Sequence, residues 1–335
     1  MTIKEVVLPA ERQRIASFLK EFGLNPESNV DQTIYMEDEN GIIATLSASK
    51  YILKCLAVKD EYRSENLAVT LVSEMIKRFH SSGIYYYQVF TKPEYSGVFK
   101  GLGFRSVLET EKVVLLEGGE GDIDDCIQKM KVQMKFSLGL DSVSENCDIA
   151  GIVINGNPFT DGHLKLVEYA SKRHKFVLVF IVEEDSSYFT FKERYAMAYL
   201  ALKPISNVLV LPSSKYIVSQ STFPGYFLKT VDETTFEYAK CDALIFEKYF
   251  MPRLGICKRY VGEEFSNHMR IYNDTLESVL GEKLEIVKRF EENGEVISAH
   301  RVRYLIKEGK TEKALEYIPR NNHALLKGMI NSRHE

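Results

Sequence analysis

"DIAGIVINGNPFTDGHLKL", residues 148–166, decides how the second half of the chain is read. Its opening apolar run has the length of a strand, and a helix-like pattern begins at its end. An apolar run without alternation is typical of a parallel strand that is covered on both faces. A plain connection needs turn residues such as Pro158 and Gly162, but it needs neither Thr160 nor His163. The stretch therefore predicts a parallel sheet with a polar site at the end of one strand.

The remainder of the second half continues the same alternation of strand and helix. We expect helices at 163–173, 190–203 and 231–240, and further strands at 175–182, 207–212, 243–246 and 258–262. Such alternation favours βαβ units, and hence a doubly wound, Rossmann-like α/β sheet. Ligands of these sheets bind beyond the carboxyl ends of the strands, which is where residues 157–163 lie.

Composition and charge limit the functions that the chain can have. At 335 residues it is too long for one ordinary core, so we expect two domains. A formal charge of −4 gives no overall attraction to nucleic acid or to anionic lipid. The apolar runs are too short for a membrane span, and no signal sequence opens the chain. The five cysteines form no CxxC pair, which favours reduced thiols in a cytoplasmic protein.

The acidic, glycine-rich stretch "LEGGEGDIDD", residues 116–125, is the predicted domain boundary. We expect a first domain over 1–118, a linker with a connecting helix over 119–146, and a second domain over 147–335. The first domain should contain helices at 11–23 and 67–83, a hairpin turn at "DENG" (38–41) and a strand at 84–91. A short helix that leads into a last strand is expected over 95–107.

The order of these elements resembles the acetyl-CoA-dependent N-acetyltransferases (the GNAT fold). In that family an R/Q-x-x-G-x-G/A loop holds a pyrophosphate on backbone amides at a helix N-terminus. The matching residues here are "RSENLA", in which Arg63 and Ala68 fit and Asn66 replaces the central glycine. Asn can adopt the left-handed backbone of such a loop, but its side chain crowds the phosphate. The resemblance implies a GNAT-like domain, in which Asn66 should make acetyl-CoA binding weak or absent.

Two short segments of the second half carry residues that suit phosphate binding. In the first, Gly162 lets the backbone come close to a ligand, while Thr160 and His163 can donate hydrogen bonds at a helix N-terminus. The second is "ISAHRVRYLIKEG", residues 297–309, in which Ser298 can cap a helix and meet a phosphate. Arg301 and Arg303 can neutralise its charge.

Together these segments resemble the nucleotidyltransferase superfamily, with its H-x-G-H signature (Thr is a common variant) and its I-S-S/T-x-x-x-R segment. His300 stands where related segments usually have Ser or Thr. A closer resemblance is to the citrate lyase ligase family, which pairs an acetyltransferase-like front domain with a nucleotidyltransferase-like domain. It is carried by "GIVINGNPFTDGH", "EDSSYFTFKERYAMA", "NVLVLPSSKYIVSQSTFPGYFLK", "YVGEE" and "ISAHRVR".

The resemblance implies an AMP-forming acid–thiol ligase. Members activate acetate with ATP, giving acetyl-adenylate and pyrophosphate, and Mg²⁺ usually accompanies the ATP. They then acetylate the thiol of the phosphoribosyl-dephospho-CoA-type group on the acyl-carrier subunit of citrate lyase. Thr160, Gly162 and His163 would surround the α- and β-phosphates. Further ligand-binding candidates are the loop residues Asn157, Pro158 and Phe159, the helix residues Ser298, Arg301 and Arg303, and the cations Arg194 and Lys229.

Several residues have an equally simple structural interpretation. Arg194 and Lys229 could equally form surface salt bridges. His174, His268 and His323 are isolated, so no protein-bound metal is expected. Glu263 and Glu264 could orient a ribose or a metal, or could simply be solvated at a strand end.

Two other functions remain open at this point. One is adenylyl transfer to a nucleotide or to a phosphopantetheine-type substrate. The other is a regulatory protein whose acetyltransferase-like domain senses an acyl-CoA. Release of pyrophosphate from ATP, with acetate and with or without a thiol acceptor, separates these possibilities from the ligase.

Overall fold

The computed structural model describes residues 2–27, 29–140, 148–184, 187–217, 223–263, 267–292 and 295–333. The chain divides into two compact units. The first contains Met1–Asp122 and Phe223–Glu237, and the second contains Ile123–Thr222 and Tyr238–Glu335. None of the described helices combines the length and the apolar character needed to cross a membrane.

The first unit is built on a seven-stranded mixed sheet with the order β1-β2-β3-β4-β5-β7-β6. Every neighbouring pair is antiparallel except β4 and β5. The turn at Asp38–Gly41 joins β2 to β3 as a hairpin, as the sequence predicts. The elements are β1 Ile3–Glu5, α1 Pro9–Glu21, β2 Gln32–Asp38, β3 Gly41–Ser49, β4 Ile52–Val58, a 3₁₀ turn Asp60–Glu65, α2 Leu67–Ser81, β5 Tyr86–Thr91, a 3₁₀ turn Pro93–Tyr95, α3 Ser96–Gly101, β6 Arg105–Glu109 and β7 Val114–Gly119.

Strand β7 is a difference from the sequence-based expectation, which placed the last strand of this part near residue 107. The glycine-rich stretch that marks the predicted boundary begins inside β7 rather than in a loop. Gly119 is required there because its φ is +85° and a Cβ would lie 2.0 Å from the carbonyl oxygen of Tyr85. The glycines therefore serve close strand packing, which composition alone does not separate from a linker.

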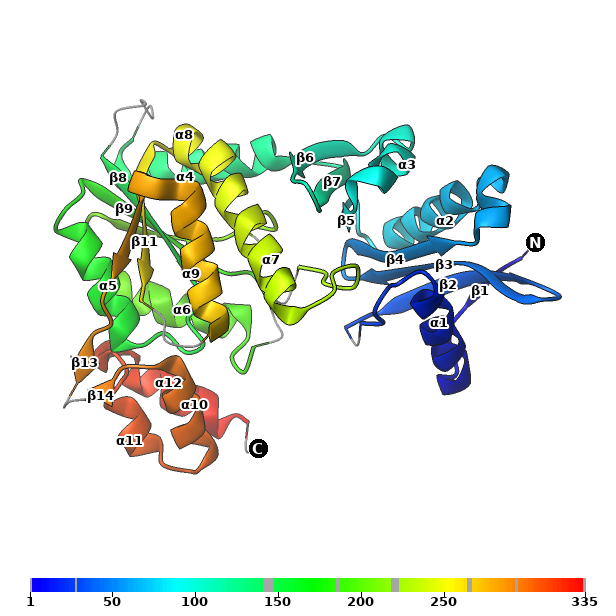
Figure 1. The fold of residues 1–335 in the computed structure, drawn as a ribbon. Coiled ribbons are helices and arrows are strands. Elements are labelled where there is room, and N and C mark those ends of the chain that lie inside the picture. Colours follow the sequence, from blue (N-terminus) through cyan, green and yellow to red (C-terminus); the bar gives the residue numbers. More distant parts are fainter. Residues whose placement is uncertain are drawn as a thin grey trace. The chain divides into compact units, whose positions relative to one another are not determined.

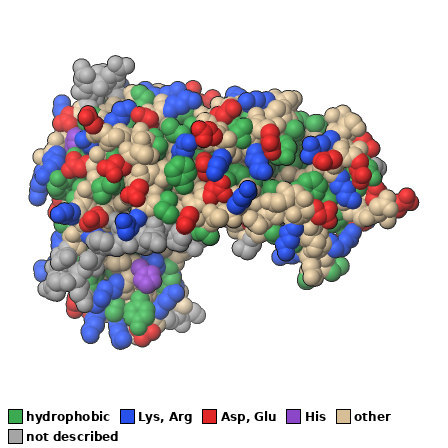
Figure 2. Space-filling view, in the orientation of Figure 1, with side chains coloured by type: hydrophobic (Ala, Val, Ile, Leu, Met, Phe, Trp, Pro, Cys, Tyr) green, Lys and Arg blue, Asp and Glu red, His purple; other side chains and the backbone are tan. Residues whose placement is uncertain are grey.

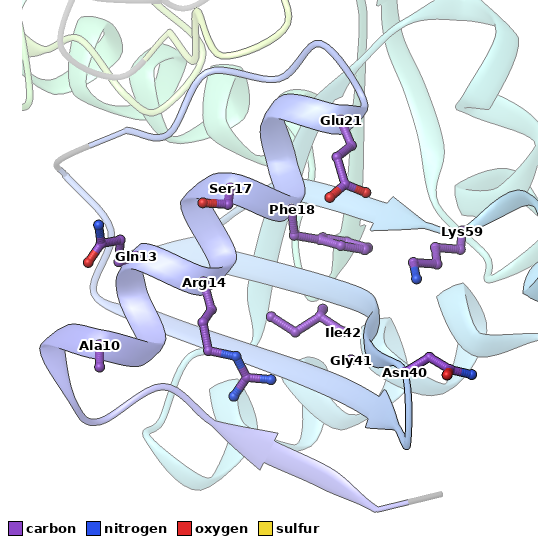
Figure 3. A pocket seen from close by; sticks show the side chains of 10 residues that line it. All are labelled: Ala10, Gln13, Arg14, Ser17, Phe18, Glu21, Asn40, Gly41, Ile42 and Lys59. Atoms are coloured by element: carbon purple, nitrogen blue, oxygen red, sulfur yellow. The ribbon is translucent and has the colours of Figure 1, made fainter.

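Helix α1 packs on the hairpin of β2 and β3. A groove lies between this helix and the hairpin. Figure 3 shows Phe18 on α1 and Ile42 on β3 close together in the groove, with Arg14, Glu21 and Lys59 around them. Phe18 and Ile42 are buried, and Arg14 pairs with Glu37 at 2.5 Å. The groove is thus an ordinary contact between a helix and a sheet, with an apolar floor and a charged rim.

Strands β4 and β5 pair over only two residues and then diverge. The segment Phe223–Glu237, which comes from the second half of the sequence, contributes Tyr226 to this part of the first unit. The Tyr226 hydroxyl donates to the carbonyl oxygen of Phe90 on β5 at 3.1 Å, and its backbone carbonyl accepts from Asn25 N–H at 2.7 Å. Glu27 accepts from Gly225 N–H at 2.9 Å. A distant segment therefore completes the core of the first unit.

The second unit contains a five-stranded parallel sheet with the order β10-β9-β8-β11-β12. This order confirms the predicted doubly wound α/β class, with the first strand at its centre. Its elements are α4 Ile123–Leu138, β8 Ile149–Ile154, α5 Asp161–Ser171, β9 Phe176–Ile181, α6 Phe191–Leu202, β10 Val208–Pro212, the part of α7 (Val231–Ile245) that follows Glu237, a π-helical turn Phe246–Phe250, α8 Met251–Leu254, β11 Ile256–Gly262, α9 Asn267–Leu280, a 3₁₀ turn Gly281–Lys283 and β12 Leu284–Val287.

One predicted strand of this unit is wrong. Residues 243–246 ("ALIF") lie at the end of α7 and the start of the π-helical turn. Ala243, Ile245 and Phe246 are fully buried, so the helix is apolar at successive positions. A short apolar run cannot distinguish a buried helix from a buried strand by periodicity.

The sheet is covered on both faces. Helices α5 and α6 pack against β8, β9 and β10, and α4, α8 and α9 contact β10, β11 and β12 respectively (Figure 1). Beyond β12 the chain forms a short antiparallel pair and then a helical end (Figure 1). These last elements are β13 Glu291–Glu292, β14 Glu295–Val296, α10 Ala299–Lys307, α11 Thr311–Leu315, a 3₁₀ turn Arg320–Asn322 and α12 His323–Asn331.

We expect Tyr226 to stabilise the first unit from its distant place in the sequence. Tyr226→Phe leaves the Phe90 carbonyl without its donor and should cost about 1–2 kcal/mol. Tyr226→Ala also opens a cavity and should cost about 3–5 kcal/mol. Hydrogen exchange of β4 and β5 in the whole chain measures the effect locally. Tyr85→Ala, at a tyrosine that is 49% exposed, is the control; unchanged exchange in Tyr226→Ala would contradict the assignment.

Candidate functional site

A pocket of about 440 Å³ lies at the carboxyl ends of β8, β11 and β12 in the second unit. The strand order reverses between β8 and β11, which is where doubly wound sheets bind ligands. Six sequence-predicted residues line the pocket together: Asn157, Thr160, Gly162, His163, Ser298 and Arg303. His300 lines it as well.

Thr160 and His163 form a capping arrangement at the start of α5. Thr160 occupies the N-cap, and its backbone N–H donates to His163 Nδ1 at 3.0 Å. The Thr160 hydroxyl lies 3.0 Å from the same nitrogen. Because a backbone N–H can only donate, Nδ1 must accept, and a neutral His163 therefore carries its proton on Nε2.

The charge state of His163 follows from its surroundings. Burial lowers the pKa of His163 to about 4, and the positive charge of Arg289 adds to the effect. The imidazole is consequently neutral at pH 7. It supplies a hydrogen-bond donor, Nε2–H, whose orientation is fixed by Thr160 before any ligand binds.

The segment that begins at Ile297 is brought to the same pocket by Gly162. A Cβ on Gly162 would lie 3.4 Å from the Ile297 side chain, so the missing side chain allows this close packing. Ser298 is the N-cap of α10 but makes no side-chain capping hydrogen bond, which leaves its hydroxyl out of the helix cap. Arg303 donates to the carbonyl oxygen of Asn157 and so joins α10 to the loop after β8.

Arg194 lies beneath the pocket rather than in its lining. Its guanidinium is completely buried and donates to the carbonyl oxygens of Asn155 (2.7 Å), Val182 (2.9 Å) and Phe189 (3.1 Å), and to that of Glu184. Asn155 follows β8 and Val182 follows β9. Arg194 thus donates hydrogen bonds to the backbone carbonyl oxygens at the strand ends. Without these hydrogen bonds, the carbonyl oxygens would repel a phosphate in the pocket.

Four other sequence candidates lie elsewhere. Phe159 is fully buried in the hydrophobic core, and the preceding Pro158 follows a cis peptide bond. Arg301 is exposed beside the Tyr317 ring, because residues two apart on a helix point in different directions. Lys229 belongs to the first unit. Glu264 and His268 fall where side chains are not described.

Sequence reasoning missed two cations of the pocket, Lys288 and Arg289. They follow β12 directly, and Arg289 Nε donates to the Glu263 carbonyl oxygen at 2.7 Å. Strand β12 itself was not predicted, since its four residues are too short to show a pattern. A basic pair directly after a parallel strand was the signal that could have found them.

The loop of the first unit that matches the acetyltransferase pattern has the expected backbone. Asn66 adopts the left-handed conformation, with φ of 56°, directly before α2. Arg63 and Ala68 line a pocket of about 360 Å³ within this unit. Tyr226 and Phe227 also line it, so part of the space between the diverging strands is already filled by the chain itself.

The geometry of the second unit agrees with a comparison against known families. Residues 149–326 match the family described as citrate lyase ligase C-terminal domain. The chain belongs to the citrate lyase ligase family.

Curated members of this family match over most of the chain. The citrate (pro-3S)-lyase ligase of Klebsiella pneumoniae is 28% identical over 97% of this chain and 95% of its own length. The citrate (pro-3S)-lyase ligase of Escherichia coli K12 is 31% identical over 87% of this chain and 83% of its own length.

Solved structures similar to part of this citrate lyase ligase family member include two acetyltransferases. An aminoglycoside 6'-N-acetyltransferase complexed with coenzyme A is 12% identical, with a TM-score of 0.32 over 36% of this chain and 100% of its own. A GNAT-family acetyltransferase from Staphylococcus aureus is 13% identical, with a TM-score of 0.31 over 35% of this chain and 99% of its own.

The depressed pKa of His163 predicts a pH dependence of stability in this ligase-family chain. Between pH 6.5 and about 4 the unfolded chain binds a proton at His163 that the folded chain does not bind. Stability from this group is therefore complete above pH 6.5 and is lost as the pH falls. Between pH 7 and 5 the native chain should lose about 1–2 kcal/mol more than His163→Asn, which keeps an acceptor for Thr160 N–H. Denaturant unfolding at both pH values measures this, and equal losses would refute it.

Proposed function

We propose that the pocket of the second unit activates acetate with ATP. The acetyl group then passes to the thiol of the phosphoribosyl-dephospho-CoA-type group on the citrate lyase acyl-carrier subunit. One observation carries the proposal: a neutral, pre-oriented His163 and the cations Arg289 and Arg303 share one pocket at a helix N-terminus in a member of the citrate lyase ligase family.

In the first step a carboxylate oxygen of acetate bonds to the α-phosphorus of ATP. The bond from that phosphorus to the bridging oxygen breaks, and pyrophosphate leaves with the electron pair. Little covalent help is needed, so positioning and charge stabilisation dominate. His163 Nε2–H would donate to an α-phosphate oxygen at the amino-terminal end of α5, where the helix dipole favours negative charge.

The leaving pyrophosphate needs positive charge and hydroxyl donors. Arg303, Lys288 and Arg289 supply the charge in the lining, and Ser298 supplies a hydroxyl that is not used in a helix cap. Arg194 would act as a positioning residue from below, because its donors are used by backbone carbonyls.

Mg²⁺ fits this pocket as a companion of the triphosphate. Among the lining residues that the structure describes, Glu263 is the one carboxylate, which is too few for a cage built by the protein. Mg²⁺ held by phosphate oxygens would reduce their charge as the adenylate forms.

In the second step the thiol sulfur attacks the acetyl carbonyl carbon and its proton passes to solvent. The bond from that carbon to the phosphate oxygen breaks, and AMP leaves with the electron pair. The acceptor arm carries phosphates, and the helical end of the chain has suitable charge. Residues 299–333 contain eight Lys and Arg against three Glu, and Figure 2 shows blue side chains spread over this region at the lower left. The first unit would contribute recognition of the arm or of its carrier.

Acetate-dependent exchange between ATP and pyrophosphate tests the first step, and acetyl transfer from labelled acetate to deacetylated citrate lyase tests the second. We expect both. Exchange that needs a nucleotide or a phosphopantetheine-type compound instead of acetate would replace the ligase by an adenylyltransferase. Acetyl-CoA binding without any exchange would replace it by a sensor.

His163→Ala should slow adenylate formation. Loss of one pre-oriented donor to a developing charge costs about 3 kcal/mol, or on the order of a hundredfold in rate, with a smaller change in apparent ATP affinity. Single-turnover formation of acetyl-adenylate measures the effect. His80→Ala, at an exposed histidine of the first unit, is the control. Near-normal turnover of folded His163→Ala would leave the histidine as a helix cap only.

Arg303→Ala should behave differently from His163→Ala. A cation that holds the triphosphate acts on bound ATP as well as on the transition state, so the ATP concentration needed for half-maximal rate should rise roughly tenfold or more. Arg301→Ala is the matched control, because Arg301 lies on the same helix outside the pocket lining. Equal effects of the two substitutions would show that only general positive charge matters.

A further inference from the structure

Three potential metal ligands meet at the amino-terminal edge of the parallel sheet. Asp148 directly precedes β8, His174 lies just before β9, and Cys257 is the second residue of β11. These strands are neighbours in the order β9-β8-β11. Because the strands are parallel, their amino-terminal ends lie side by side and bring the three side chains together. The nucleotide pocket lies at the other, carboxyl ends of the strands.

The ligand atoms are close enough to share one ion. His174 Nδ1 lies 2.5 Å from Asp148 Oδ1, and Cys257 Sγ lies 3.7 Å from Nδ1 and 4.0 Å from Oδ1. A tetrahedral Zn²⁺ at its usual bond lengths separates such atoms by about 3.3–3.6 Å. The Asp148 side chain is 54% exposed, so its carboxylate can turn by the ångström that this requires.

Hydrogen bonds outside the cluster orient two of these ligands. Asp148 Oδ2 accepts from the Lys175 backbone N–H at 3.1 Å, which leaves Oδ1 toward His174 and Cys257. On the other side, His174 Nε2 lies 2.8 Å from the Tyr260 hydroxyl oxygen. Partners of this kind fix the ring of a metal-binding histidine.

The Tyr260 hydroxyl decides which nitrogen of His174 is free. Tyr260 is buried beside Glu285, an acceptor that also receives the Tyr169 hydroxyl at 2.8 Å. When the Tyr260 hydrogen is given to Glu285, the Tyr260 oxygen accepts from His174 Nε2–H. Nδ1 of a neutral His174 then has a free lone pair that faces the Asp148 carboxylate.

Two acceptor atoms at 2.5 Å need a proton or a metal ion between them. A proton can join Nδ1 to Oδ1, and the Cys257 thiol then donates to the Ile149 carbonyl oxygen at 3.4 Å. A metal ion uses all three atoms, and nitrogen, sulfur and carboxylate oxygen form the ligand set of Zn²⁺ and of similar ions such as Co²⁺.

We propose that Asp148, His174 and Cys257 form a Zn²⁺ site at the amino-terminal edge of the sheet. Binding displaces the thiol proton of Cys257 to solvent, and the exposed side leaves a fourth position for water. The site is separate from the proposed acetate-activating pocket. It joins the starts of three strands, which predicts a structural role.

Titration of the metal-free whole chain, prepared without a histidine tag, tests the proposal. Calorimetry should show one Zn²⁺ bound with micromolar or tighter affinity. Co²⁺ should give a thiolate-to-cobalt absorption band in the near ultraviolet. Both signals should disappear in Cys257→Ser and in His174→Gln, and should remain in the matched Cys126→Ser.

A variant outside the ligand set gives a second measurement. Tyr260→Phe removes the partner of His174 Nε2 and should weaken Zn²⁺ binding by about tenfold, while the cobalt–thiolate band remains. Binding only at millimolar Zn²⁺, or a cobalt band that persists in Cys257→Ser, would overturn the proposal and leave an imidazolium–aspartate pair. Should Cys257→Ser not fold, Asp148→Asn, at an exposed side chain, takes its place. Loss of the cobalt–thiolate band in Asp148→Asn would support the site, and an unchanged band would overturn it.

Discussion

The buried guanidinium of Arg194 is the constraint on which the pocket of the second unit depends. Carbonyl groups at the carboxyl ends of β8 and β9 would be costly to bury unpaired, and would present negative dipoles to a phosphate. Arg194 satisfies these groups from a single side chain and also binds the start of its own helix, α6. The loop after β8, which carries Thr160 and His163, is therefore anchored to the neighbouring strand.

On this base the pocket is arranged before a ligand arrives. Thr160 fixes the tautomer of His163, and burial keeps the imidazole neutral among cations. A neutral donor costs less to hold beside Arg289 than a second positive charge would. Gly162 lets Ile297 pack closely, so the two segments that line the pocket meet although they lie far apart in the sequence. The arrangement of the pocket thus comes from backbone contacts as much as from charged side chains.

Much of the fold could be predicted because local patterns and tertiary structure agree. The apolar run at 149–154 and the amphipathic helix at 67–81 have the periods of their elements. The prediction failed at 243–246, where burial makes a helix apolar on all sides, and at 114–119, where glycines serve strand packing. It also could not reveal that Phe223–Glu237 completes the first unit, since no local pattern shows which core a segment will enter.

By itself the sequence determined the fold class, the family and the two segments of the pocket, because Thr160, Gly162 and His163 are adjacent and Ser298 and Arg303 share one helix start. Only the tertiary structure shows that Arg303 lines the pocket whereas Arg301 does not. It also shows that Arg194 lies below the pocket and that Arg289 lines it. It alone also brought His174 to Asp148 and Cys257, which are 26 and 83 residues away. The physical reason is that spacing encodes which residues share a helix or loop, whereas the parallel strands decide which distant loops share an edge.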